Sequence, residues 1–190
     1  TLDKRDQSFK PTDGYKAKFI QSLPLLQDSS SLYNAIDVKT YHDFSDDIIG
    51  SLKFVTKGIF GIDDDVRLTK RLYLPRTSLR GFDVFKVGPK DGNDYIGGNY
   101  LTALSAEAQF PNLLPESYNT DFTVFLDTAN IWGVDYDNTV DETSKIRSSI
   151  GIGANVYSVL GPLSFVFAQD LTKSANDETQ TFSFNLGTSF

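Results

Sequence analysis

The most constraining feature of this sequence is an alternation of apolar and polar side chains that recurs along most of the chain. In residues 122–132, for example, Phe122, Val124 and Leu126 fall on the face opposite to Thr123 and Asp127. A β-strand places successive side chains on opposite faces, so this pattern predicts strands with one apolar and one polar face. It appears in eight segments: residues 14–23, 32–41, 49–60, 100–110, 122–132, 145–157, 162–168 and 179–190. Residues 2–6 form a candidate ninth strand that is cut short.

The length of these segments and the composition indicate how the apolar faces are buried. Most segments are close to the roughly 9–11 residues that a tilted strand needs to cross a bilayer. Hydrophobic residues make up 39% of the chain, which is below the usual soluble share of about 45–50%. A membrane β-barrel needs apolar side chains on only one face of each strand. The sequence therefore predicts an all-β fold, an antiparallel transmembrane β-barrel segment of about eight strands.

The connections between the predicted strands alternate in length. Residues 11–14, 43–47 and 160–162 are short connections, and residues 112–119 are intermediate. The long connections are residues 25–31, 61–98, 133–144 and 172–178. Short periplasmic turns and long outer loops are typical of outer-membrane barrels, so we expect the cell outer membrane as the location.

Composition also argues against several other classes of protein. The net charge of −7 disfavours nucleic-acid binding, and the lack of Cys rules out disulfides, thiolate metal sites and a Cys nucleophile. We expect no cofactor, no metal and no enzymatic activity. His42, near Asp43 and Asp46, leaves a His–Asp hydrolase as a weaker alternative to a surface histidine. The acidic residues in 63–65 and 135–141 fit solvated loops better than a cation site.

Loop 61–98 is too long for an ordinary connection, which indicates a functional role. It contains the tetrapeptide Leu79-Arg80-Gly81-Phe82. Glycine permits a tight turn, and a guanidinium can bind carboxylates through two parallel hydrogen bonds. Glu107 and Asp127 lie on the polar faces of the next two predicted strands. The sequence is thus compatible with a loop tip folded inward, and a solvated surface arginine is the alternative.

Several segments resemble, in the same order, the C-terminal barrel of the BamA-type family of outer-membrane assembly factors. The loop tetrapeptide resembles a Val/Ile-Arg-Gly-Phe motif of that family, with Leu79 in first place. Residues 125–132 resemble a Phe-x-Asp-x-Gly-x-Val-Trp strand, with Ala129 where glycine is usual. The other matching segments are residues 2–6, 9–15, 97–99, 105–107, 161–163 and 184–190, the last resembling a terminal β-signal.

The resemblance implies that residues 1–190 are the C-terminal half of a sixteen-stranded barrel, without the N-terminal half-barrel and the POTRA domains. It implies that the protein inserts and folds β-barrel proteins in the outer membrane through a lateral gate that templates an incoming strand. Unfolded outer-membrane clients, outer-membrane lipid and periplasmic accessory lipoproteins would be its partners.

The resemblance also implies roles for two groups of residues. Arg80, Gly81 and Phe82 would anchor the long loop, with Arg80 paired to Glu107 and Asp127. The terminal strand would form one edge of the gate, and its residues of interest are Phe182, Phe184, Leu186, Gly187 and Phe190. Two alternatives stay open: a secretion pore of the same superfamily, and a small self-closed outer-membrane barrel with a structural or adhesive role.

Overall fold

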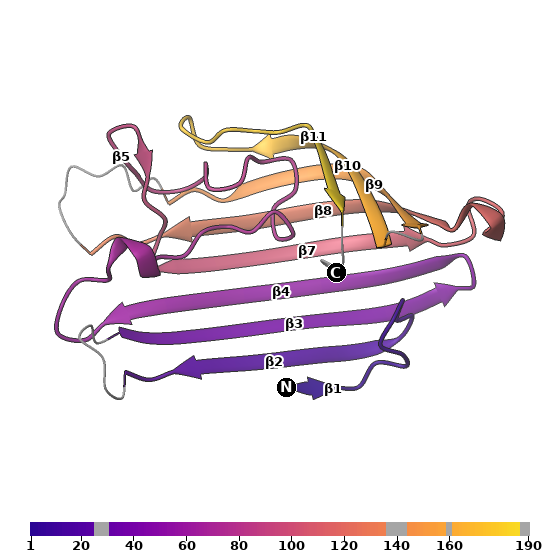
Figure 1. Ribbon diagram of the computed structural model, residues 1–190, viewed down its shortest axis with the longest axis horizontal. Coiled ribbons are helices and arrows are strands. Elements are labelled where there is room, and N and C mark those ends of the chain that lie inside the picture. The colour runs from indigo at the N-terminus through magenta and orange to yellow at the C-terminus, as the bar shows by residue number, and fades with distance from the viewer. Residues whose placement is uncertain (25–30, 136–143, 159–160, 187–190) are drawn as a thin grey trace.

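The computed structural model describes residues 1–24, 31–135, 144–158 and 161–186. Its main element is a nine-stranded sheet in the order β1-β2-β3-β4-β7-β8-β9-β10-β11, with all neighbours antiparallel. The sheet curls, so that one of its faces is concave (Figure 1). The predicted all-β, antiparallel fold is confirmed. Among the described residues, no helix has the length and apolarity needed to span a bilayer.

The observed strands follow the predicted segments closely. The main sheet contains β1 (Leu2–Asp3), β2 (Gly14–Ser22), β3 (Ser31–Ser45), β4 (Ile48–Gly61), β7 (Tyr100–Phe110), β8 (Thr120–Trp132), β9 (Arg147–Ser158), β10 (Gly161–Thr172) and β11 (Phe182–Leu186). The candidate ninth strand is β1, which pairs Leu2 with Ala17. Gly187 and Phe190, which we predict in the terminal strand, lie outside the described residues.

The convex face of the sheet carries large apolar side chains that are exposed. Apart from β1, every strand of the main sheet contributes, with Phe19, Ile36, Leu52, Phe54, Leu104, Val124, Leu126, Ile150, Ile152, Phe167, Phe182 and Phe184. An apolar surface of this extent is unfavourable in water. It matches the lipid-facing band of a membrane barrel, so the alternation seen in the sequence has its structural explanation here.

The long connection between β4 and β7 folds back against the concave face instead of projecting away from the sheet (Figure 1). It contains two short regular pieces, the 3-10 helix η1 (Leu68–Lys70) and the hairpin β5 (Lys90–Asp91) with β6 (Asp94–Tyr95). Apolar side chains from the loop and from the inner faces of the strands form one buried cluster: Val55, Leu74, Leu79, Phe82, Val87, Leu101, Ala103, Ala129 and Ile131.

This cluster departs from the expectation of a polar inner face. Under the loop the inner faces of β4, β7 and β8 are apolar, with Leu101 and Ile131 fully buried. Burying one such side chain stabilises a fold by about 1.5–3 kcal/mol. The loop is therefore held on the sheet by a hydrophobic core of its own.

The described sheet is open. Strands β1 and β11 stand at its two ends and are not paired with each other in the described parts of the chain. A barrel that closes on itself would join these two edges. The structure thus does not show the small self-closed barrel that was one of our alternatives.

Candidate functional site

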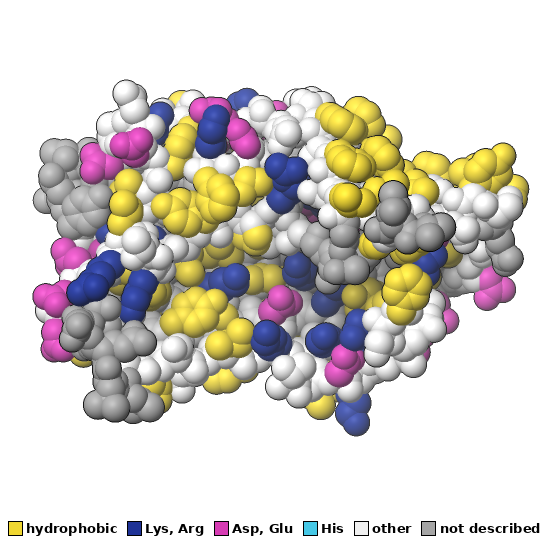
Figure 2. Space-filling view, viewed as in Figure 1, with side chains coloured by type: hydrophobic (Ala, Val, Ile, Leu, Met, Phe, Trp, Pro, Cys, Tyr) yellow, Lys and Arg dark blue, Asp and Glu magenta, His cyan; other side chains and the backbone are white. Residues whose placement is uncertain are grey.

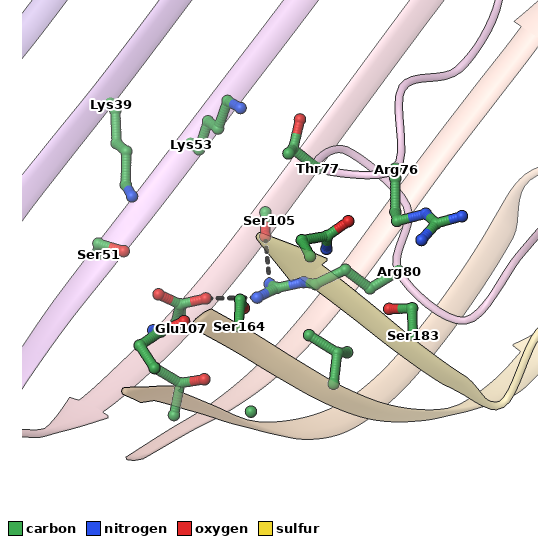
Figure 3. Close-up of a pocket in the computed structure, with 15 residues that line it drawn as sticks. Lys39, Ser51, Lys53, Arg76, Thr77, Arg80, Ser105, Glu107, Ser164 and Ser183 are labelled. Carbon is green, nitrogen blue, oxygen red and sulfur yellow. Dashed lines mark hydrogen bonds and ion pairs between the residues drawn. The ribbon is translucent and has the colours of Figure 1, made fainter. Parts of the chain in front are cut away.

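Arg80, at the inward tip of the long loop, lies between acidic side chains of β7 and β8. Its Nε and one terminal nitrogen donate to the two carboxylate oxygens of Asp127, each at 2.8 Å. Its other terminal nitrogen donates to Glu107 Oε2 at 2.5 Å. The backbone N–H of Arg80 also donates to Asp127, at 3.0 Å. Figure 3 shows the guanidinium pointing from the loop toward Glu107 and Ser105. The structure therefore brings together the arginine and the two acids singled out in the sequence.

Burial and charge make this ion pair strong. The Asp127 side chain is 0% exposed and that of Arg80 is 15% exposed. Burial by itself lowers the pKa of Arg80, but the hydrogen bonds and charges of Asp127 and Glu107 outweigh it and raise the pKa. The guanidinium also lies over the Phe125 ring, 3.4 Å from the ring centre. Arg80 therefore stays charged, with its charge shared between two acids and an aromatic face.

Gly81 and Phe82 place the arginine. Gly81 has φ +88°, and a Cβ there would lie 2.9 Å from the Cβ of Ala168 on β10. Only glycine allows both this backbone conformation and this close approach. Phe82 is buried in the apolar cluster under the loop. The two residues after Arg80 thus fix the turn and the depth of the loop tip.

Two serines complete the site and were not singled out in the sequence. Ser105 Oγ donates to Asp127 and accepts from Arg80, the latter at 3.1 Å. Ser149 Oγ donates to the backbone oxygen of Arg80 at 2.5 Å. Both sit directly across from Asp127 on neighbouring strands. Alternation alone puts them on the polar face, but only the strand register shows that they flank Asp127.

A second buried ion pair, also not anticipated, joins β9 to the connection between β10 and β11. Arg147 and Asp177 have side chains that are 1% and 0% exposed, with Nε 2.8 Å from Oδ2. A terminal nitrogen of Arg147 donates to Asp177 Oδ1 at 3.1 Å. Asp177 also accepts from the backbone N–H of Gly88, on the long loop, at 3.2 Å. One carboxylate therefore connects three segments of the chain.

Further contacts join the long loop to the same connection. Backbone hydrogen bonds run from Gln180 to Gly81 at 2.9 Å and from Asp83 to Glu178 at 3.0 Å. Lys86 Nζ lies 2.7 Å from Glu178 Oε2, and this hydrogen bond raises the pKa of Lys86. The long loop and the segment that leads into β11 therefore form one hydrogen-bonded unit. We call it the loop–hairpin unit: residues 81–88 of the long loop and residues 177–180 of the β10–β11 hairpin.

The terminal strand β11 pairs with β10 along one edge only. Phe182, Phe184 and Leu186 are exposed on the convex side. Phe182 and Phe184 stack against Phe167 and Phe165 of β10, with ring centres 4.8 Å and 5.1 Å apart. Among the described residues, the other edge of β11 has no strand beside it.

The remaining candidates from the sequence do not form a built site. His42 lies 3.4 Å from an oxygen of Asp13 and close to Asp43, and all three side chains are exposed. Asp135 accepts hydrogen bonds from Arg71 and from the Val66 backbone, so it holds the loop in place. The other acids of the segment 135–141 lie outside the described residues.

A curved antiparallel sheet with an apolar convex face, and with a loop pinned into its concave face, is the wall of a membrane β-barrel. Over residues 1–190 the chain matches the Omp85 superfamily domain, and it belongs to that superfamily. The predictions of a BamA-type barrel segment and of an outer-membrane location are confirmed by this match and by the relatives.

Similar proteins include two bacterial assembly factors and a yeast protein. The outer membrane protein assembly factor BamA of Neorickettsia risticii is 28% identical over 196 residues, covering 100% of this chain and 26% of the relative. BamA of Neisseria meningitidis is 30% identical over 142 residues, covering 60% of this chain and 18% of the relative. The sorting assembly machinery 50 kDa subunit of Saccharomyces cerevisiae is 26% identical over 209 residues, covering 100% of this chain and 41% of the relative.

The fold agrees with a solved barrel. The crystal structure of BamA from Haemophilus ducreyi lacking POTRA domains 1–3 superimposes with a TM-score of 0.84 at 24% identity. The match covers 96% of this chain and 40% of that one. The chain thus spans less than half the length of each of these relatives.

Proposed function

We propose that residues 1–190 form the C-terminal half of a larger barrel, and that the whole protein inserts and folds β-barrel proteins in the outer membrane. The observation that carries this proposal is the superfamily match along the entire chain, together with relatives named as assembly factors. The open sheet supports the first part, because a membrane barrel needs every backbone edge paired. The N-terminal half-barrel and the POTRA domains would complete the protein.

The unpaired edge of β11 is the proposed site of action. An exposed strand edge offers a row of backbone donors and acceptors to an incoming strand. The β10 side of β11 is already paired from Phe182 to Leu186, so an incoming strand would add to the free edge. Phe182, Phe184 and Leu186 would keep this edge in lipid, and Gly187 and Phe190 would continue it.

Arg80 has a positioning role in this proposal. Its ion pairs with Asp127 and Glu107 hold the loop tip on the inner wall. The loop–hairpin unit then transmits that position to the segment that precedes β11. Loss of the arginine would release the loop and disturb the edge that receives clients.

The activity we propose is not enzymatic and uses no cofactor. Strand pairing and burial of the client's apolar face in lipid supply the free energy. The partners are unfolded outer-membrane proteins, the surrounding lipid and periplasmic accessory lipoproteins.

Site-directed disulfide formation tests whether a client strand pairs with the free edge of β11. The absence of Cys from this chain simplifies the experiment. Asn185→Cys on β11 and Ser164→Cys on β10 form a matched pair, because these two residues face each other across the β10–β11 ladder. The full-length protein in vesicles should form a disulfide with a cysteine-bearing client strand at position 185 and not at position 164. Equal yields at both positions, or a client secreted through the barrel without insertion, would contradict the proposal.

A further inference from the structure

A cavity of about 260 Å³ lies on the concave side of the sheet, beside the tip of the long loop. Strands β3, β4 and β7 to β11 contribute to its wall, and the loop contributes Arg76 and Arg80. Figure 2 shows Lys and Arg side chains gathered in the hollow of this face, with few acidic side chains among them. The cavity is therefore a positively charged recess inside the barrel wall.

Three of the cations that line the cavity form no direct ion pair among the described residues, and Asp37 on β3 adds a longer-range negative charge beside Lys53. Lys39 and Lys53 sit directly opposite each other on β3 and β4. Arg76 comes from the loop (Figure 3). Within the described parts of the chain, none of these three side chains has an acidic partner within 4.0 Å. Arg80, in contrast, is satisfied by Asp127 and Glu107.

An anion in the recess would offset the repulsion between these cations. Like charges directly opposite each other on neighbouring strands repel, and a partly enclosed site weakens solvent screening. A carboxylate placed between such cations would make charge-assisted hydrogen bonds to them. The chemistry of the recess therefore selects a negatively charged group.

The position of the recess indicates which anion can reach it. The convex face of the sheet is apolar and points away from the recess, so the lipid that contacts this face does not reach the cavity. The inner face of β11, in contrast, lines the recess with Ser183 and Asn185. A strand added to the free edge of β11 would place every second side chain next to these two residues.

We propose that this recess, which we call the cationic recess (Lys39, Lys53 and Arg76), binds Asp and Glu side chains at alternating positions on an incoming client strand. The inference rests on the proposed function, because it assumes that clients approach β11. It adds a charge preference to the backbone pairing, so that strands with acidic lumen-facing residues bind more tightly than neutral ones.

Peptide binding to the full-length protein in lipid nanodiscs tests this inference. The probes are two fluorescein-labelled extended peptides of the same sequence, one with Glu and one with Gln at alternating positions. Fluorescence anisotropy should show tighter binding of the Glu peptide, by about tenfold, as hydrogen bonds to charged groups predict. This preference should weaken as salt is raised.

Substitutions of Lys39 and Lys53 test whether the cationic recess causes the preference for the Glu peptide. Lys39→Gln combined with Lys53→Gln should remove the preference for Glu and leave binding of the Gln peptide unchanged. Lys57→Gln is the matched control, since Lys57 lies on the same face of β4 but does not line the cavity. The charge reversal Lys53→Glu should favour a third peptide of the same sequence that carries Lys at the alternating positions. Heat-modifiable mobility on gels checks that every variant is folded.

Three results would overturn the inference. One is equal affinity of the unaltered protein for the Glu and Gln peptides. Another is an equal loss of preference in the control variant. The third is displacement of the Glu peptide by inorganic phosphate at low concentration, which would indicate a site for small anions. A failure of the proposed function would appear separately, as no insertion of an unmodified client by the unaltered protein.

Discussion

At the scale of single residues, Arg80 joins the tip of the long loop to two acids on the inner face of the sheet. Asp127 is fully buried, so removing its partner leaves an unpaired charge inside the protein. Breaking a buried pair from one side typically costs about 3–5 kcal/mol. The hydrogen bonds of Asp127 to Ser105 and to the Arg80 backbone do not supply the missing positive charge.

Arg80→Ala should therefore lower the free energy of unfolding by about 3–5 kcal/mol and expose the loop to protease. Arg76→Ala, four residues earlier on the same loop, is the control and should have little effect. Asp127→Asn introduced together with Arg80→Ala should recover part of the lost stability, because it removes the unpaired charge of Asp127. Denaturant titration and limited proteolysis measure both effects. Equal stability of the two alanine variants would rule out the anchoring role.

Gly81 offers a second residue-scale prediction. Gly81→Ala should destabilise the docked loop by at least about 1–2 kcal/mol, since it adds a left-handed backbone penalty to a clash with Ala168. Gly92→Ala is a matched control: φ there is +58°, and a Cβ would meet nothing within 4 Å. Proteolysis rates of the loop distinguish the two. Equal proteolysis rates for the two variants would show that the close approach of Gly81 to β10 does not matter for the stability of the docked loop.

At the scale of elements, the loop–hairpin unit joins two connections that are far apart in sequence. Asp177 lies at its centre, because Arg147 of β9 and the Gly88 backbone both donate to it. Lys86 and Glu178 lie at its exposed rim. Buried and exposed ion pairs within one unit should differ strongly in their contribution.

Asp177→Asn should accordingly cost about 3–5 kcal/mol and increase amide hydrogen exchange in both halves of the unit. Lys86→Gln should leave exchange nearly unchanged, because solvent screens that pair. Hydrogen–deuterium exchange with mass spectrometry reports on both segments at once. Faster exchange restricted to the segment 177–180 would show that the two connections are not coupled.

At the scale of the whole molecule, the two faces of the sheet meet different surroundings. The convex face is apolar and the concave face carries the arginine site, the apolar cluster and the cationic recess. A membrane barrel of this orientation tolerates charge on the inner face only.

Leu126→Lys, on the convex face of β8, should therefore destabilise the full-length protein in lipid by about 2–4 kcal/mol. Ser51→Lys adds the same side chain to the concave face, directly across from Glu107, and should be tolerated. Denaturant unfolding in vesicles gives both values. A similar loss for both variants would contradict the assignment of lipid to the convex face.

The sequence by itself determined the strands and their two faces, while the inward tip of the loop was an expectation that came from the family resemblance. The alternation of side chains depends only on the local geometry of a strand, so it can be interpreted without knowing which strand pairs with which. The loop tetrapeptide pointed to Arg80, and the alternation placed Glu107 and Asp127 on the correct face.

Only the tertiary structure decided the remaining features of the site. The apolar cluster under the loop, the pair of Arg147 with Asp177, and the opposition of Lys39 to Lys53 all join residues distant in sequence. A shift of register by two residues keeps every side chain on its face but changes every neighbour. The alternation of side chains is the same before and after such a shift. The packed loop and its buried ion pairs, in contrast, fit the register found here. The physical reason is that a strand's faces are a local property, while its partners are chosen by the free energy of the whole assembly.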